Sequence, residues 1–211
     1  MDIFVQEDFV NKKISMRHVL DSVFKKVPTH LSRGLDAIYV GNFDFLNNRD
    51  LDAMYKDGAI FLSNDKKSVA DVADDIVHEL AHLVETEYGS LIYGDGQIEQ
   101  EFIEKRKDLF FSLKEEMNNM ELTLIDFLDP EYNPQFDQFL YQELGYSMLS
   151  IMTINLFYSP YGATSLREYF ANCFEGFFWD RDIVRIKSLS PKVYSKLERL
   201  IEEVRENENE Y

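Results

Sequence analysis

The feature that most constrains this chain is the segment from Ser68 to Gly89, which has the pattern of one amphipathic helix. Its apolar residues recur every three or four positions and line one helical face: Val69, Val72, Ala73, Ile76, Val77, Leu80, Ala81, Leu83 and Val84. Ser68 is a suitable N-cap, with Asp71 three residues later in the place that a capping box requires. Gly89 is suited to end the segment. We therefore expect a helix over residues 68–89.

Within this segment stands the run His78-Glu79-Leu80-Ala81-His82. Histidines four residues apart project from the same side of a helix, so both imidazoles can reach one ion. Glu79 lies one residue round, where a carboxylate can hold a metal-bound water without being a ligand itself. The pattern predicts zinc binding, while the plainer interpretation is a pair of polar histidines on a helix. Catalysis would further require a third ligand and an open coordination position.

Length and composition favour one globular domain. The chain has 211 residues, of which 45% are hydrophobic, enough for a substantial core. Its net charge is −17 and its sequence pI is about 4.6. A protein that binds nucleic acid by neutralising phosphates needs the opposite balance, so we expect no nucleic-acid partner. The acidity chiefly favours solubility, and the alternative is electrostatic steering of basic peptides.

The lone cysteine, Cys173, cannot form an intramolecular disulfide and suits a reducing compartment. The first residues lack a basic region followed by an apolar run, so no signal peptide is expected. The most apolar stretch, Met148 to Tyr158, is short and interrupted by polar residues, which favours a buried helix over a membrane span. These features predict a cytoplasmic protein with no membrane partner.

A small sheet is expected before the His78 helix. Residues 37–40 are β-branched and aromatic and precede Gly41-Asn42, as at the end of a strand. Residues 53–55 and 59–62 flank Lys56-Asp57-Gly58, which is a hairpin signal. The sequence thus predicts a small, mostly antiparallel sheet.

Helical patterns dominate the rest of the chain. They fall at residues 14–27, 98–117, 122–128, 136–157, from Thr164 or Ser165 to 178, and 191–204, followed by a polar tail at 206–211. The predicted class is α+β with a mainly helical C-terminal half. We expect a single domain over residues 1–211, with a helical insertion at about 95–158 whose acidic faces are solvated.

The third zinc ligand must come from elsewhere in the chain. The short extension of metzincins is excluded, because Glu85 stands where their glycine would be and Tyr88 where their third histidine would be. Glu168 is the best candidate, since a carboxylate in the first turns of an otherwise apolar helix is costly unless a cation compensates it. The plainer interpretation is a first-turn acid favoured by the helix dipole. Three further acids compete: Asp95, Glu99 and Glu101.

Three sequence elements together resemble a known family: His78-Glu-Leu-Ala-His82, Tyr161, and Glu168-Tyr-Phe-Ala171. The set resembles the gluzincin-type catalytic domain of anthrax lethal factor and its relatives, the Pro-Pro endopeptidases. In that family a tyrosine stands seven residues before the glutamate ligand, and Tyr161 and Glu168 have this separation. The resemblance covers roughly residues 38–62, the His78 helix and residues 161–178. The connection from His82 to Tyr161 is longer than the family's usual segment.

The resemblance implies a zincin-like fold and the activity of a HExxH zinc metallopeptidase. Under it, His78, His82 and Glu168 hold one Zn²⁺ per chain. Glu79 is then the general base, and Tyr161 stabilises the oxyanion.

The resemblance also implies contacts beyond the ligands. The strand at residues 59–63 would present its edge to an extended peptide, through Ala59, Ile60 and Phe61. In thermolysin-like gluzincins an Asp follows the ligand glutamate by four residues and orients a histidine. Asn172 stands at that place here, and its amide oxygen can accept such a bond.

Two classes of function follow. The first is a zinc-dependent endopeptidase that hydrolyses a peptide or protein substrate by a metal-activated water, either broadly or in one dedicated partner. The second is a non-catalytic, zincin-like interaction or assembly module, with the metal structural or absent. The presence of Glu79 and Tyr161 favours the first, because a structural metal site needs neither. The sequence does not decide the oligomeric state.

Overall fold

A computed structural model describes residues 1–117 and 120–208 of the chain. The chain divides into two compact units. The first contains residues 1–89 and 178–180, and the second contains the remaining described residues. The assignment of residues 1–211 to one domain with an insertion at about 95–158 stays a prediction.

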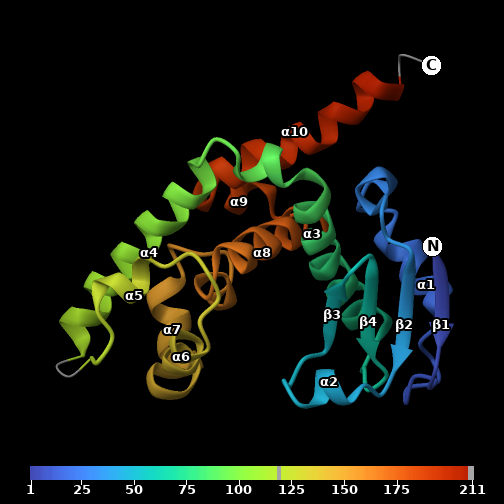
Figure 1. Ribbon diagram of the computed structural model, residues 1–211, viewed down its shortest axis with the longest axis horizontal. Coiled ribbons are helices and arrows are strands. Elements are labelled where there is room, and N and C mark those ends of the chain that lie inside the picture. Colours follow the sequence, from blue (N-terminus) through green and yellow to red (C-terminus); the bar gives the residue numbers. More distant parts are fainter. Residues whose placement is uncertain (118–119, 209–211) are drawn as a thin grey trace. The chain divides into compact units, whose positions relative to one another are not determined.

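The first unit is built on a four-stranded sheet with strand order β1-β2-β4-β3 (Figure 1). The strands are β1 (Asp2–Val5), β2 (Ala37–Gly41), β3 (Ala53–Lys56) and β4 (Ala59–Ser63). β1 and β4 both pair with β2 in parallel, and only β3 and β4 are antiparallel. The α+β class is confirmed, whereas the prediction of a mostly antiparallel sheet was wrong.

The error has a physical origin in the connections. Tight turns leave a local signal, and the predicted hairpin is present, with positive φ at Asp57 and Gly58. Parallel pairing instead requires a crossover, and here α1 (Met16–Val23) and a short 3₁₀ turn (Thr29–Ser32) separate β1 from β2. β1 itself has only four residues, all exposed, so it lacked the alternation that identifies a strand.

The two faces of the sheet differ in character. Ile38 and Val40 of β2 and Ile60 and Leu62 of β4 are fully buried. On the other face, the rings of Phe4, Tyr39 and Phe61 stack across three strands with centroids 5.0 Å apart. This alternation places an aliphatic layer on one side of the sheet and an aromatic ladder on the other.

The predicted His78 helix is α3 (Val69–Tyr93). The backbone N–H of Asp71 donates to Ser68 Oγ at 3.2 Å, so the expected N-cap is confirmed. The regular helix is interrupted at Tyr88 (φ −118°, ψ 18°), one residue before the expected end at Gly89. A second helical segment follows this kink and reaches Tyr93.

The second unit is helical. Its elements are α4 (Gln97–Glu116), α5 (Leu124–Leu128), α6 (Pro134–Gln138), a π-helix (Phe139–Gly145), α7 (Tyr146–Thr153), a 3₁₀ turn (Pro160–Ala163), α8 (Leu166–Phe178), α9 (Ile183–Leu189) and α10 (Pro191–Glu208). The single helix expected over residues 136–157 is broken at Gly145. That residue has φ 79°, a conformation that glycine adopts without strain.

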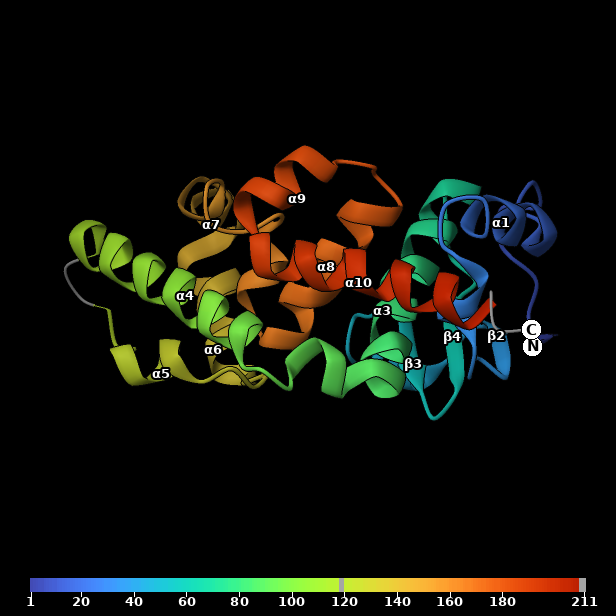
Figure 2. The same cartoon turned by 90° about the horizontal axis from the view of Figure 1, so that it is seen from above.

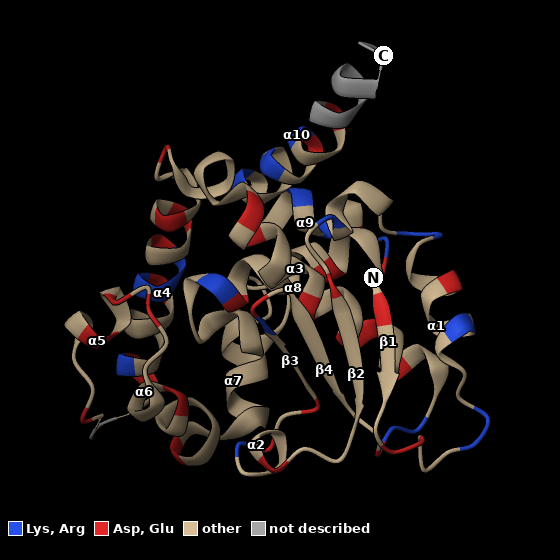
Figure 3. Cartoon of the chain, turned by 45° about the vertical axis from the view of Figure 1, so that its right-hand side comes forward, with Lys and Arg blue, Asp and Glu red and all other residues tan. Residues whose placement is uncertain are grey.

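Within this unit α10 packs against α4 and α9 (Figure 2). No Lys, Arg or His occurs between residues 115 and 166, and Figure 3 shows acidic positions on α5 and α6. Within residues 1–117 and 120–208, no helix combines the length and apolar character that crossing a membrane requires.

Candidate metal centre

The α3 helix presents the two candidate histidines on one side, as their spacing predicted. The ring centroids of His78 and His82 lie 5.3 Å apart at an interplanar angle of 82°. Both Glu79 and His82 are buried. The apolar residues from Val72 to Val84 on the same helix are fully buried, so the core fixes the direction in which this polar group points.

Glu85 orients His82. Its Oε2 lies 2.7 Å from His82 Nδ1, and the carboxylate is buried. A carboxylate at Nδ1 fixes the orientation of the ring and makes Nε2 the candidate metal-binding nitrogen, an arrangement that is common for histidines that bind metals. Sequence reasoning used Glu85 only to exclude the metzincin extension. Its i, i+3 spacing from His82 was the signal that could have identified this role.

Glu79 is held at the border of the sheet. The backbone N–H of Tyr55 donates to Glu79 Oε2 at 2.6 Å. Tyr55 belongs to β3, an outer strand of the sheet. This contact was invisible in the sequence because it joins residues 24 positions apart.

A second, partly buried carboxylate lies one turn before Glu79. Burial raises the pKa of Asp75 to about 6, although the hydrogen bond and charge of Lys66 act in the opposite direction. Lys66 Nζ lies 2.6 Å from Asp75 and 3.0 Å from Asp52, and its side chain is buried. Since Asp52 immediately precedes β3, this bridge ties α3 to the strand that contacts Glu79.

Glu168 lies in the first turn of α8, where the sequence placed it. Its backbone N–H donates to Ser165 Oγ at 3.2 Å, so Ser165 caps the helix. Asn172 Nδ2 donates to the Glu168 carbonyl at 2.9 Å, and its Oδ1 accepts a bond from Ser159 Oγ. Asn172 thus steadies the turn that carries Glu168. The expectation that Asn172 orients a histidine stays a prediction. The side chain that contacts Nδ1 of His82 is Glu85.

Tyr161 lies in the 3₁₀ turn before α8 and is 36% exposed. Its ring centroid is 6.2 Å from that of Tyr141, and its carbonyl accepts a bond from Thr164 Oγ1 at 2.7 Å. Burial, and then the negative charge of Glu168, raise the pKa of the Tyr161 hydroxyl well above its usual range. The hydroxyl therefore keeps its proton at neutral pH and can act as a hydrogen-bond donor.

The structure groups His78, His82 and Glu168 as one set of potential metal ligands. The ligand atoms of the three side chains all lie within 4.8 Å of one another. Two imidazole nitrogens and one carboxylate oxygen suit a transition metal, whereas Mg²⁺ and Ca²⁺ prefer oxygen ligands only. The residues present therefore fit the ion that the sequence predicted.

The competing acids have other partners or lie on the surface. Asp95 is paired with Lys196 at 2.6 Å. Glu101 accepts bonds from the Tyr169 hydroxyl at 2.8 Å and from the Lys192 backbone N–H at 3.0 Å. Glu99 is exposed. Among the described residues they do not join the ligand group.

The strand that was expected to present its edge to a substrate lies inside the sheet, and substrate contact by its residues stays a prediction. Ala59, Ile60 and Phe61 belong to β4, which pairs with β2 on one side and β3 on the other. Its backbone groups are therefore committed within the sheet, and it offers no edge to a peptide. The parallel pairing with β2, which the sequence did not reveal, is what moves β4 to the interior.

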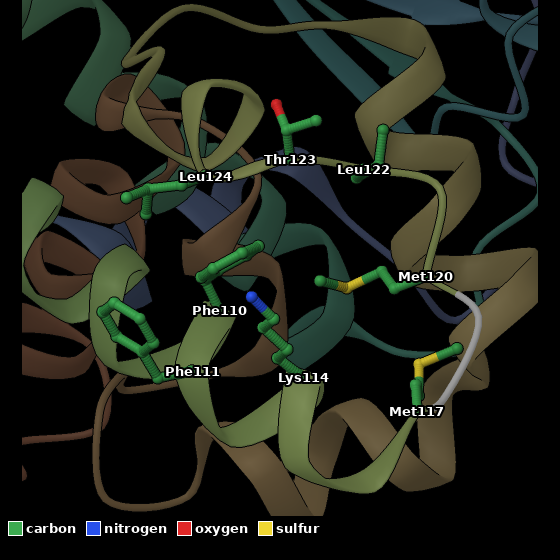
Figure 4. A pocket seen from close by; sticks show the side chains of 8 residues that line it. All are labelled: Phe110, Phe111, Lys114, Met117, Met120, Leu122, Thr123 and Leu124. Atoms are coloured by element: carbon green, nitrogen blue, oxygen red, sulfur yellow. The ribbon is translucent and has the colours of Figure 1, made fainter.

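A separate pocket of about 590 Å³ lies at the end of α4 (Figure 4). The rings of Phe110 and Phe111 and the side chains of Met117 and Met120 line it, with Lys114 as the charged member. Leu122, Thr123 and Leu124 complete the lining, and the pocket contains none of the candidate ligands.

Comparisons with protein-family models, with curated proteins and with solved structures gave no match to this chain. The assignment of a function rests on the residues of the site.

Proposed function

We propose that this protein is a zinc-dependent endopeptidase. The observation that carries the proposal is the grouping of His78, His82 and Glu168, whose potential ligand atoms lie within 4.8 Å of one another. Two histidines and a glutamate are the ligand set of catalytic zinc sites that keep a fourth position for water. Zinc in such a site supplies a Lewis acid that makes water nucleophilic near neutral pH.

Glu79 would act as the general base. Its carboxylate accepts the proton of the attacking water and later delivers it to the departing amine. The hydrogen bond from the Tyr55 N–H fixes one carboxylate oxygen, Oε2, and leaves Oε1 to accept the proton. The protonated Tyr161 hydroxyl would donate to the oxyanion that develops on the scissile carbonyl.

An extended peptide would bind along the outer edge of β3. The Ser63 N–H donates to the Asp52 carbonyl at 2.9 Å, so these two residues form a hydrogen-bonded pair between β4 and β3. In an antiparallel ladder, every second residue of a strand points its backbone groups away from the partner strand. Ala53 and Tyr55 therefore direct their backbone groups away from β4. Because the Tyr55 N–H is bonded to Glu79, a peptide would pair with the Ala53 groups and the Tyr55 carbonyl, which would place it beside the proposed base. The buried, unpaired Cys173 fits a reducing compartment such as the cytoplasm.

The experiment is metal analysis combined with cleavage of a diverse peptide library, for the wild type and for Glu79→Gln. The amide keeps the size of the side chain but cannot accept the proton, so cleavage should fall by roughly two to four orders of magnitude while bound zinc is retained. Glu87→Gln, on an exposed position of the same helix, is the matched control and should cleave normally. Wild-type protein that is folded and zinc-loaded but cuts nothing in the library would contradict the proposal.

A further inference from the structure

Arg106 on α4 is buried without a carboxylate partner among its hydrogen bonds. It is 1% exposed, which is unusual for a charged side chain. Its guanidinium donates instead to three backbone carbonyls: Nη1 to Ala163 at 3.2 Å and Thr164 at 3.3 Å, and Nη2 to Asp126 at 2.8 Å. Burial lowers the pKa of Arg106, yet a guanidinium remains protonated at neutral pH.

Aromatic rings complete the surroundings of this cation. The Cζ atom lies 3.8 Å from the ring centroid of Phe136 and 5.3 Å and 5.7 Å from those of Phe102 and Phe127. The ring faces and the carbonyl dipoles replace part of the lost hydration, and the negative charges of Asp129 and Asp126 also favour the cation. Since a guanidinium is a rigid planar fork and an ammonium is a point charge, lysine could not serve the same three carbonyls while stacking on Phe136.

Two of the three carbonyls, those of Ala163 and Thr164, lie where the 3₁₀ turn ends and α8 begins. The 3₁₀ turn ends at Ala163, and the first backbone bond of α8 runs from the Tyr169 N–H to the Ser165 carbonyl. The carbonyls of Ala163 and Thr164 therefore have no helical donor. Buried carbonyls need partners, and Arg106 supplies them from a helix 57 residues earlier in the chain.

This junction between the 3₁₀ turn and α8 lies between two residues of the proposed active site. Tyr161 stands two residues before Ala163, and its carbonyl accepts from Thr164 Oγ1 at 2.7 Å. Glu168 stands four residues after Thr164, and its N–H is capped by Ser165 Oγ at 3.2 Å. The backbone that Arg106 anchors is therefore the segment that sets the directions of both side chains.

We propose that Arg106 is a positioning residue, which fixes the backbone at Ala163 and Thr164 so that Tyr161 and Glu168 stay aligned. The proposal rests on the proposed function for its catalytic consequence, but its effect on metal affinity is independent of turnover. Because a misplacement of about 1 Å can cost a hundredfold in rate, loosening this anchor should be visible in kcat.

The test compares Arg106→Met and Arg106→Lys with Leu109→Ala. Leu109 is fully buried on the same helix, and its apolar side chain cannot donate a hydrogen bond to the carbonyls of Ala163 and Thr164, so its truncation controls for lost stability. All variants are measured well below their unfolding midpoints, with equal far-UV circular dichroism. Zinc affinity is measured by chelator competition, and kcat and KM on a peptide cleaved by the wild type.

Arg106→Met is expected to lower kcat by roughly ten- to a hundredfold and to weaken zinc binding by about tenfold, with a smaller change in KM. Arg106→Lys should show the same losses, because an ammonium group lacks the planar set of N–H donors with which a guanidinium reaches several carbonyls. Leu109→Ala should change kcat and zinc affinity by less than about threefold, since only stability is reduced.

Equal behaviour of Arg106→Met and Leu109→Ala would overturn the proposal, because Arg106 would then contribute only to stability. Full retention of kcat and zinc affinity in Arg106→Lys would also overturn it, and this variant decides the question if Arg106→Met does not fold. A wild type that binds zinc but cleaves nothing would remove the proposed function alone. The zinc-affinity comparison would still decide the role of Arg106.

Discussion

The helices α3 and α8, which supply the candidate ligands, support their functional residues by different means. On α3 the two histidines, the proposed base and the carboxylate that orients His82 all lie within residues 78–85. A partner from outside the helix, the Tyr55 N–H, contacts Glu79. On α8 the single candidate ligand, Glu168, is steadied by a cap and by Asn172.

The approach to α8 depends on residues far away in the sequence. The Leu166 N–H donates to the Pro130 carbonyl at 2.8 Å, and the two carbonyls just before it accept from Arg106. The positions of the functional residues on α3 are therefore determined mainly by local sequence spacing, whereas the position of the backbone that carries Glu168 is determined mainly by tertiary contacts. Changes on α3 should therefore act directly on the metal, and changes around α8 should act through alignment.

The largest expected effect comes from removing a ligand on α3. His82→Ala should lower zinc affinity by roughly three orders of magnitude or more, because it removes one of the three proposed ligands, and structural zinc sites owe about 10–16 kcal/mol of binding free energy to their full ligand sets. Metal analysis after gel filtration measures the loss, and thermal unfolding should show a lower midpoint. The exposed His18 provides the control, since His18→Ala should keep zinc. Full zinc retention in His82→Ala would contradict the assignment of His82 as a metal ligand.

The next effect tests the hydroxyl of Tyr161, which lies in the turn before α8. Tyr161→Phe should lower kcat by roughly two to three orders of magnitude, the scale of one lost oxyanion donor, while zinc content is unchanged. Steady-state kinetics on a peptide cleaved by the wild type provides the measurement. Tyr158→Phe is the control, because it lies on the other side of Ser159-Pro160. A loss with Tyr158→Phe instead would mean that Tyr158, not Tyr161, is the donor.

A smaller effect is expected when the orientation of His82 is weakened. Glu85→Gln should reduce zinc affinity by roughly ten- to a hundredfold, because an amide holds the imidazole less firmly than a carboxylate does. Chelator competition measures the affinity, with Glu87→Gln as the exposed control on the same helix. If Glu85→Gln binds zinc as tightly as the control, then the support of α3 does not include this contact.

The sequence predicted what local spacing determines. The apolar periodicity placed α3, and the histidine spacing placed both nitrogen ligands on one side of it. The choice of Glu168 also depended on a local conflict, a carboxylate on an otherwise apolar helix, and the structure groups it with the histidines. Sequence reasoning also identified the α+β class and the β3–β4 hairpin.

What the sequence did not predict depends on pairing between distant segments. The parallel contacts of β2 with β1 and β4 made β3 the outer strand, and no local pattern encodes such contacts. The contacts of Glu79 with Tyr55 and of Arg106 with Ala163 and Thr164 are likewise long-range. An arginine at position 106 fitted the helical rhythm, but its burial follows only from the aromatic rings that the fold gathers around it.

The smallest effect compares the two helix caps. Ser68→Ala and Ser165→Ala each remove an N-cap bond, to the Asp71 and Glu168 N–H groups respectively, and each should cost about 1 kcal/mol in the free energy of unfolding. Ser68 lies ten residues before His78, so its loss should leave zinc affinity unchanged. Ser165 caps the turn that carries Glu168, so its loss should weaken zinc binding by a few fold, because about 1 kcal/mol of the free energy that holds this turn in place is lost. Denaturant titration and chelator competition give the two quantities for each variant. Equal zinc affinities for the two variants, with equal losses of stability, would mean that α8 holds its ligand as firmly as α3 does.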